Sequence, residues 1–351
     1  MNFPIRGVNF KSPHGERHHH NFVRGLLHRG KVRESQRRRG QSDSTLIKTV
    51  KHDWTDAARQ RVVPVKIYSP RDEPGPFPVI IFSHGLGSSR DVYGYLGRHW
   101  AGKGFVSVHV QHAGTDSAVW EKSPVSQRME LLQRAAALPE NFKNRPKDIS
   151  FAIDELTRLN QSDAHWANRL DLDRIGVAGH SFGAFTALAS VGEIFSTPRG
   201  ERISFHDPRI KAAIAMSPPV FPKQAQLESA YTQIKVPCFH MTGTEDDSPV
   251  GETKAGDRRV VFDRISAPHQ YLATFTGGDH FIFSGRWAGK SGGEQDKTFQ
   301  ELISSSSTTF WNAFLKNDGM ALGWLQKNFS QELGSRGIFE MKTATTAQHS
   351  S

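Results

Sequence analysis

Residues 174–190 read RIGVAGHSFGAFTALAS, and this stretch decides the fold. The apolar residues up to Ala178 predict a short buried strand, and the segment 182–191 predicts a helix directly behind it. Between them, residues 179–183 match the pattern G-x-S-x-G, in which a serine stands on a sharp turn from strand to helix. A β-carbon at either outer position would collide with neighbouring backbone, so both are glycine. The pentapeptide alone is common, but its strand-helix context makes Ser181 a candidate nucleophile.

The rest of the chain alternates apolar strand-like runs with longer segments of helical period, which predicts an α/β fold with a mostly parallel sheet. Pro64 lies inside the first run and would confine that strand to a sheet edge. One closing helix is expected near the end of the chain, and a polar, frayed tail from Ser330 onward. The expected strands are 61–68, 78–83, 105–110, 174–178, 210–216, 236–241 and 269–275, and the expected helices are 91–103, 125–137, 147–159, 182–191 and 298–325.

A serine hydroxyl needs a base to remove its proton and an acid to orient that base. In folds with this turn the order along the chain is Ser, acid, His. His280 follows the last predicted strand and is the candidate base, and the Asp beside it at position 279 is expected to be structural. Glu245, Asp246 and Asp247 all follow the strand 236–241, and the register G-x-x-D from Gly243 favours Asp246 as the acid.

The loop after the strand 78–83 reads SHGLGSS at 83–89, and its glycines let the backbone turn inward. Acyl transfer requires N–H donors aimed at the oxygen that becomes negative. Leu86 in this loop and Phe182 after the serine are the expected backbone donors. His84, Trp120 and Phe281 are expected to shape the substrate pocket, and the region 113–146 to form part of a cap over it.

Three segments resemble one family: residues 82–87 (FSHGLG), 179–183 (GHSFG) and 278–280 (GDH). They are similar to the platelet-activating factor acetylhydrolase and dienelactone-hydrolase-related branch of the α/β hydrolases, over about residues 53–325. The resemblance implies the α/β-hydrolase fold, a central mostly parallel sheet flanked by helices. It also implies a serine carboxylic ester hydrolase that acts on short-chain or modified acyl esters through an acyl-enzyme, with oxyanion donors at Leu86 and Phe182 and with no metal or cofactor. Ala184 stands where such enzymes often carry another glycine, and small esters or polyester fragments stay open as substrates beside phospholipids.

Two alternatives remain. An amidase or peptidase of the same fold would use the same three side chains, because both reactions pass through the same kind of tetrahedral intermediate. A non-catalytic binding protein of this fold is the alternative from another class, since a fold does not imply an activity. The presence of candidates for all three catalytic side chains argues against it.

The positive charge is concentrated at the start of the chain. Residues 1–40 hold ten Lys or Arg against two Glu, so that eight of the ten net positive charges lie there. We expect a basic, disordered arm at 1–45, a catalytic domain at 46–329 and a polar tail at 330–351. The near-neutral remainder predicts a small-molecule ester substrate and no nucleic acid partner.

The sequence leaves the location and the oligomeric state undetermined. The arm has no clear secretory signal, resembles a transit peptide or upstream sequence from a misplaced start codon, and leaves a cytoplasmic protein as the default expectation. No segment has the roughly 18 apolar residues of a transmembrane helix. Cys238 is the only cysteine, which excludes an intramolecular disulfide.

Overall fold

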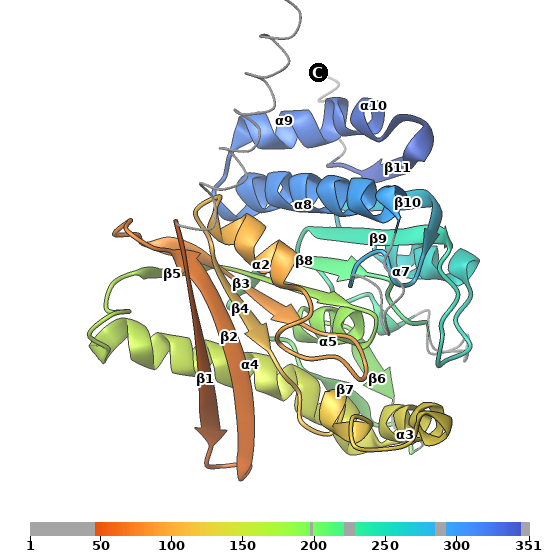
Figure 1. Ribbon diagram of the computed structural model, residues 1–351. Helices are drawn as coiled ribbons and strands as arrows, with labels where there is room; N and C mark the ends of the chain where they lie inside the picture. Colours follow the sequence, from red (N-terminus) through yellow and green to blue (C-terminus); the bar gives the residue numbers. More distant parts are fainter. Residues whose placement is uncertain (1–45, 197–198, 221–228, 285–292, 345–351) are drawn as a thin grey trace, which may run out of the picture. The chain divides into compact units, whose positions relative to one another are not determined.

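The computed structural model describes residues 46–196, 199–220, 229–284 and 293–344, so the predicted arm at 1–45 lies outside the described residues. Within them, nine strands form one sheet in the order β1-β2-β4-β3-β5-β8-β9-β10-β11, and β6 pairs with β7 apart from it (Figure 1). The strands are β1 (Ile47–Asp56), β2 (Arg61–Pro70), β3 (Phe77–Ser83), β4 (Val106–Val110), β5 (Leu170–His180), β6 (Ile194–Ser196), β7 (Arg202–Ser204), β8 (Ile210–Met216), β9 (Cys238–Glu245), β10 (Gln270–Asp279) and β11 (Gly337–Lys342).

The centre of the sheet is parallel. Strands β4, β3, β5, β8, β9 and β10 run in one direction, whereas β1, β2 and β11 add antiparallel edges. The helices are α2 (Gly94–Ala101), η1 (Ser117–Val119), α3 (Val125–Ala137), α4 (Pro139–Ser162), α5 (Phe182–Ser190), η2 (Ala255–Arg259), α7 (Val260–Arg264), α8 (Glu294–Leu315), α9 (Gly319–Lys327), α10 (Phe329–Leu333) and η3 (Gly334–Arg336).

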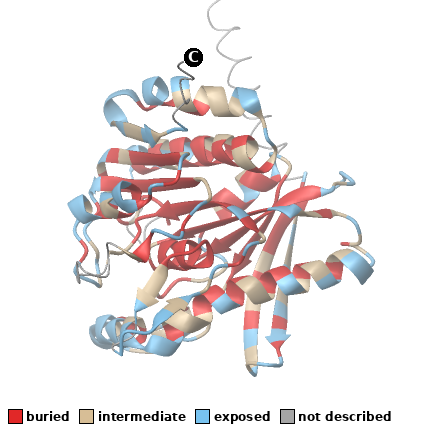
Figure 2. Ribbon diagram, turned by 180° about the vertical axis from the view of Figure 1, so that it is seen from behind, coloured by how far each residue is buried: buried red, intermediate tan, exposed pale blue. Residues whose placement is uncertain are grey.

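Helices cover both faces of the sheet, and β3 shows how. All seven of its residues are buried, as in a strand packed on two sides (Figure 2). Because side chains alternate along a strand, Val79 and Ile81 join the core with α4, α5 and α7, while Ile80 and Phe82 join the core with α2 and α8. This architecture confirms the predicted fold class.

The prediction that Pro64 confines its strand to an edge is wrong, because β2 lies between β1 and β4. The ladder between β2 and β4 begins only at the pair Val65 and Val110. Pro64 lies one residue before it, where its carbonyl accepts from the N–H of Gln111 at 2.8 Å. Proline has no N–H to donate, but Pro64 lies beyond the end of β4, so the ladder loses no hydrogen bond there.

The single closing helix predicted at 298–325 is two helices, α8 and α9. Asn317 takes a positive φ of 54° between them, which stops α8. Asp318 then caps α9, because its carboxylate accepts from the N–H groups of Met320 and Ala321.

The frayed tail predicted from Ser330 is also wrong for most of its length. Residues 337–342 form β11, which pairs antiparallel with β10 and closes that edge of the sheet. Phe339 anchors the strand, since its ring stacks on Tyr271 and packs edge-on against Phe329. Phe239 is a third ring partner, and these aromatic contacts outweigh the polar composition around Phe339. No described helix is long and apolar enough to cross a membrane.

Candidate active site

Ser181 occupies the turn between β5 and α5 in a backbone conformation that non-glycine residues rarely adopt, with φ 56° and ψ −119°. Its N–H donates to the carbonyl of Met216 at 2.8 Å, which ties the turn to β8. A β-carbon on Gly179 would come within 2.1 Å of the carbonyl oxygen of Gly183, and one on Gly183 within 1.9 Å of that of Ser83. Both glycines are thus required by close backbone approach.

The structure brings Ser181, His280 and Asp246 into one chain of hydrogen bonds. The Oγ of Ser181 lies 3.0 Å from Nε2 of His280, and Nδ1 of the same ring lies 2.7 Å from Oδ1 of Asp246. A neutral imidazole with its proton on Nδ1 donates to the carboxylate and accepts from the serine hydroxyl. These are the positions and partners that a nucleophile, a base and an orienting acid need.

The carboxylate of Asp246 is buried and fully engaged. Its second oxygen accepts from the hydroxyls of Ser217 at 2.6 Å and Thr242 at 2.8 Å, and the buried guanidinium of Arg258 lies 3.4 Å from the first. Burial alone would raise the pKa of Asp246, but the hydrogen bond and charge of His280 and the charge of Arg258 outweigh it, so this pKa is lowered. The carboxylate therefore stays ionised beside His280.

The two neighbouring carboxylates point elsewhere. The side chain of Asp247 accepts from the N–H of Ala255 and from the ammonium of Lys254, both at 3.0 Å. Glu245 is exposed at the end of β9. The alternatives left open by the sequence are thereby separated by geometry, and only Asp246 reaches the imidazole.

Two backbone N–H groups beside Ser181 have no acceptor within the described residues, and they belong to Leu86 and Phe182. Their neighbours are occupied: the N–H of Gly85 donates to the hydroxyl of Tyr93, and that of Gly87 donates to the carbonyl of Thr115. The N–H of Phe182 also lies at the N-terminus of α5, where the peptide dipoles favour negative charge. Both residues line the pocket in front of the serine.

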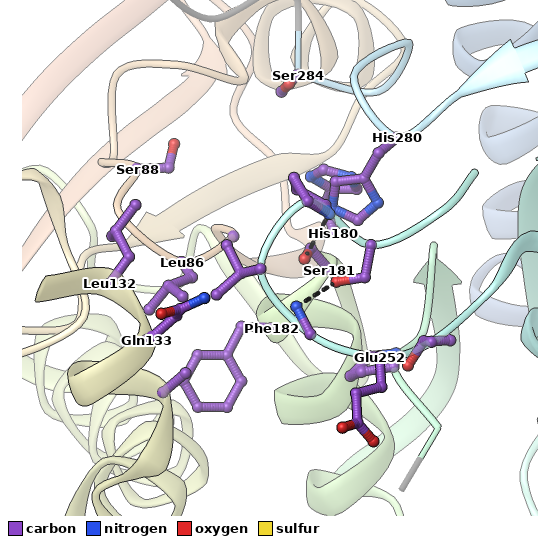
Figure 3. A pocket seen from close by; sticks show the side chains of 18 of the residues that line it. Leu86, Ser88, Leu132, Gln133, His180, Ser181, Phe182, Glu252, His280 and Ser284 are labelled. Atoms are coloured by element: carbon purple, nitrogen blue, oxygen red, sulfur yellow. Dashed lines mark hydrogen bonds between the residues drawn. The ribbon is translucent and has the colours of Figure 1, made fainter. Parts of the chain in front are cut away.

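Ser181 opens into an apolar cavity of about 500 Å³ (Figure 3). Helix α3 supplies one wall through Met129, Leu132 and Ala136, in the region where the sequence predicts a cap. In the close-up, Leu86, Leu132 and Gln133 lie on one side of Ser181 and His280 on the other. Most of the other lining residues come from the loops after β3, β8, β9 and β10, which are carboxyl ends of parallel strands.

Of the three expected pocket residues, Phe281 lines the cavity, whereas His84 and Trp120 lie outside it. The ring of His84 turns into the protein, where Nδ1 donates to the carbonyl of Gly85 and Nε2 accepts from the N–H of His112. The indole N–H of Trp120 donates to the carbonyl of Gly87 at 2.7 Å. Both side chains therefore brace the 83–88 loop from behind.

Two buried side chains next to His280 could not be predicted from the sequence pattern. The ring of His180 packs against that of His280 with 4.8 Å between centroids, and its Nδ1 lies 2.8 Å from the hydroxyl of Tyr93. Burial, together with the charge of His280, holds the pKa of His180 well below its usual value, so this ring is neutral. His180 fills the variable position of G-x-S-x-G, so only its packing could identify it.

In the part of the chain that the structure describes, no group of three or more His, Cys, Asp or Glu side chains is arranged to hold a metal ion. The thiol of Cys238 is buried in β9, and burial raises its pKa.

The chain is similar to known proteins in sequence. A family model described as platelet-activating factor acetylhydrolase, isoform II, matches residues 48–145, which include the 83–88 loop but not Ser181. A platelet-activating factor acetylhydrolase of Cavia porcellus is 25% identical over 301 residues, covering 77% of this chain and 63% of that protein. Proteins of the same name from Canis lupus familiaris and Bos taurus are each 26% identical over 233 residues, covering 57% of this chain and 49% of theirs.

The chain thus spans about half to just under two thirds of the length of the curated relatives it matches. The parallel sheet and the serine on its sharp turn have the architecture of the α/β-hydrolase fold, and in sequence the chain is similar to the platelet-activating factor acetylhydrolases.

Proposed function

We propose that this protein is a serine hydrolase that cleaves carboxylic esters through an acyl-enzyme on Ser181. The observation that carries the proposal is the continuous hydrogen-bond chain from Ser181 through His280 to the buried Asp246, placed at the mouth of an apolar cavity. A buried chain of this kind leaves one reactive atom, the serine Oγ, at the cavity surface. A protein that only binds a ligand has no need of such an activated serine.

The geometry supports one step for each group. Nε2 of His280 takes the proton from Ser181 as its oxygen attacks the ester carbonyl, and Asp246 stabilises the imidazolium that forms. The N–H groups of Leu86 and Phe182 donate hydrogen bonds to the carbonyl oxygen as negative charge develops on it. The imidazolium then gives its proton to the leaving alcohol, and a water activated by the same ring releases the acid.

The cavity supports an ester with apolar substituents as the substrate. Its walls are mainly aliphatic and aromatic, and a volume near 500 Å³ is within the range that encloses a drug-sized molecule. This fits short-chain or modified acyl esters on an alcohol with apolar groups. The relatives named platelet-activating factor acetylhydrolase support an ester of the phospholipid type within this class.

The proposal is tested with nitrophenyl esters of increasing acyl length beside a nitroanilide of the same acyl group. The purified wild type should hydrolyse the short esters with kcat/KM far above that for the anilide, and Ser181→Ala should lower kcat by several orders of magnitude. A fluorophosphonate probe should label the wild type at Ser181 and leave Ser181→Ala unlabelled. Ester hydrolysis that survives in Ser181→Ala would refute the assignment, and preferential cleavage of the anilide would indicate an amidase.

A further inference from the structure

Arg145 of α4 is a buried arginine placed behind the proposed oxyanion site. Its side chain is fully buried, and no carboxylate lies within ion-pair distance of it among the described residues. Burial lowers its pKa to about 9, which still leaves it protonated at neutral pH. A buried charge without a carboxylate is costly unless hydrogen bonds satisfy its donors.

The guanidinium reaches four acceptors in three separate segments. Its Nε donates to the hydroxyl of Thr186 at 2.9 Å and its Nη1 to the hydroxyl of Thr115 at 2.7 Å. Its Nη2 donates to the hydroxyl of Ser83 at 3.1 Å and to the carbonyl of His84. A planar group with donors in a rigid fork holds such acceptors at set separations, which a lysine ammonium does not.

These acceptors belong to the segments that carry the two proposed oxyanion donors, or are hydrogen-bonded to those segments. The carbonyl of His84 lies two residues before Leu86, and Thr115, whose hydroxyl Arg145 binds, accepts the N–H of Gly87 on its carbonyl at 2.7 Å. The loop is thereby held on both sides of Leu86, the residue whose own N–H has no acceptor.

The start of α5 is held in the same way. The hydroxyl of Thr186 accepts from Arg145 and donates to the carbonyl of Phe182 at 2.9 Å. The guanidinium carbon also lies 4.6 Å from the centre of the Phe182 ring, a cation–π distance. One side chain therefore connects the two segments that carry the free N–H groups.

A second Ser-His-Asp chain of hydrogen bonds contacts Arg145 through the hydroxyl of Ser83. Ser83 lies 2.9 Å from Nε2 of His112, whose Nδ1 lies 2.9 Å from Asp148, and all three side chains are fully buried. Burial and the charge of Arg145 lower the pKa of His112 to about 4, so the ring is neutral. Its Nε2 can then accept a hydrogen bond from the hydroxyl of Ser83. The oxygen of Ser83 then faces Arg145 as an acceptor. This chain has no access to a substrate and serves to orient the hydroxyl.

We infer that Arg145 is a positioning residue that sets the distance between the two oxyanion donors, by holding the loop of Leu86 and the helix start of Phe182 from one guanidinium. The inference rests on the proposed function, since it needs negative charge to develop between these donors.

The test compares Arg145→Lys and Thr115→Val with the wild type. Arg145→Lys keeps the charge but loses the fork, and Thr115→Val removes one acceptor next to Gly87 with little change in volume. Arg209→Lys and Thr157→Val are the matched controls, because Arg209 pairs with Asp207 away from the cavity and the hydroxyl of Thr157 binds a carbonyl within α4. The readouts are kcat and KM on a nitrophenyl ester, the rate of fluorophosphonate labelling, the affinity for a trifluoromethyl ketone and the Tm.

Displacement of one oxyanion donor costs about 100-fold or more in kcat in other serine hydrolases. We therefore expect Arg145→Lys to lower kcat about 100-fold and Thr115→Val about 10-fold, each with KM within two-fold of the wild type. Labelling rate and trifluoromethyl ketone affinity should fall in parallel, because both adducts place a negative oxygen between the same donors. The two controls should keep wild-type values.

Folded Arg145→Lys with unchanged kcat and ketone affinity would overturn the inference. If that variant does not fold, Thr115→Val decides, and an unchanged kcat and ketone affinity there would overturn it equally. A wild type that neither hydrolyses esters nor is labelled at Ser181 would instead refute the proposed function. The wild-type measurements thus separate the two failures.

Discussion

The guanidinium of Arg258 lies 3.4 Å from the carboxylate of Asp246, and both side chains are buried. The same guanidinium donates to the carbonyls of Ser217, Pro218 and Asp246 itself. Nδ1 of His280 lies 3.3 Å from it, but both groups carry protons, so the arginine and the histidine share the carboxylate as acceptor. The acid is thereby held in place by its side chain and by its backbone.

The acid should be identifiable by mutation. Asp246→Asn keeps the shape but loses the charge that stabilises the imidazolium, so kcat should fall up to about 10,000-fold with little change in KM. Asp247→Asn should change kcat less than about three-fold, because its carboxylate contacts Lys254 and the N–H of Ala255. Both are measured on one ester at the pH optimum. The reverse ranking would move the acid to Asp247.

Gly183 should tolerate no side chain. Gly183→Ala places a carbon against the carbonyl of Ser83, which is backbone and cannot move aside, so the free energy of unfolding should fall by about 3 kcal/mol or more. Gly256→Ala is the control, since its β-carbon would meet nothing within 4 Å. Urea unfolding of the two variants checks this. Equal stability of Gly183→Ala and wild type would show that the turn is not as closely packed as described.

The burial of Glu193 predicts that the stability of the protein depends on pH. Its side chain is buried, one of its oxygens has no hydrogen-bond partner among the described residues, and burial raises its pKa well above the ordinary 4.5. The neutral form of Glu193 stabilises the folded state. Its contribution to the free energy of unfolding is therefore full below pH 4.5 and is lost progressively as the pH rises through the pKa of the folded state.

Glu193→Gln cannot ionise and should remove that loss. Its Tm should match that of the wild type near pH 4.5 and exceed it by several degrees at pH 8, in thermal unfolding followed by circular dichroism. A difference between the two proteins that stays constant across this range would show that Glu193 does not titrate with folding.

The wall formed by α3 should control the size of the substrate. Ala136→Phe adds a ring to the cavity and should lower kcat/KM for long acyl esters at least about ten-fold more than for the acetate ester. Arg134→Phe, which places the same ring at an exposed position of the same helix outside the cavity, is the control. The measurement is kcat/KM across an ester series. A uniform loss across all lengths would place the acyl group elsewhere.

Much of the fold could be predicted from local patterns. The strand at 210–216 and the helix at 125–137 have the predicted bounds, and the parallel order follows from strands that alternate with helices. The failures share a cause, which is that a contact with a distant segment outweighed local composition. Phe339 makes β11 a strand through partners on β10 and α10, and Pro64 is accommodated because β4 ends beside it.

The sequence by itself determined that a serine stands between two glycines on a strand-to-helix turn, and that carboxylates and a histidine follow later strands. Short-range sterics dictate these features, so they are visible in one segment at a time. Only the tertiary structure decided that Asp246 and not Asp247 faces His280, that His84 and Trp120 lie behind the loop, and that Arg145 connects Leu86 with Phe182. Those relationships depend on the directions of side chains from segments up to about a hundred residues apart, which are set when the sheet and its helices pack.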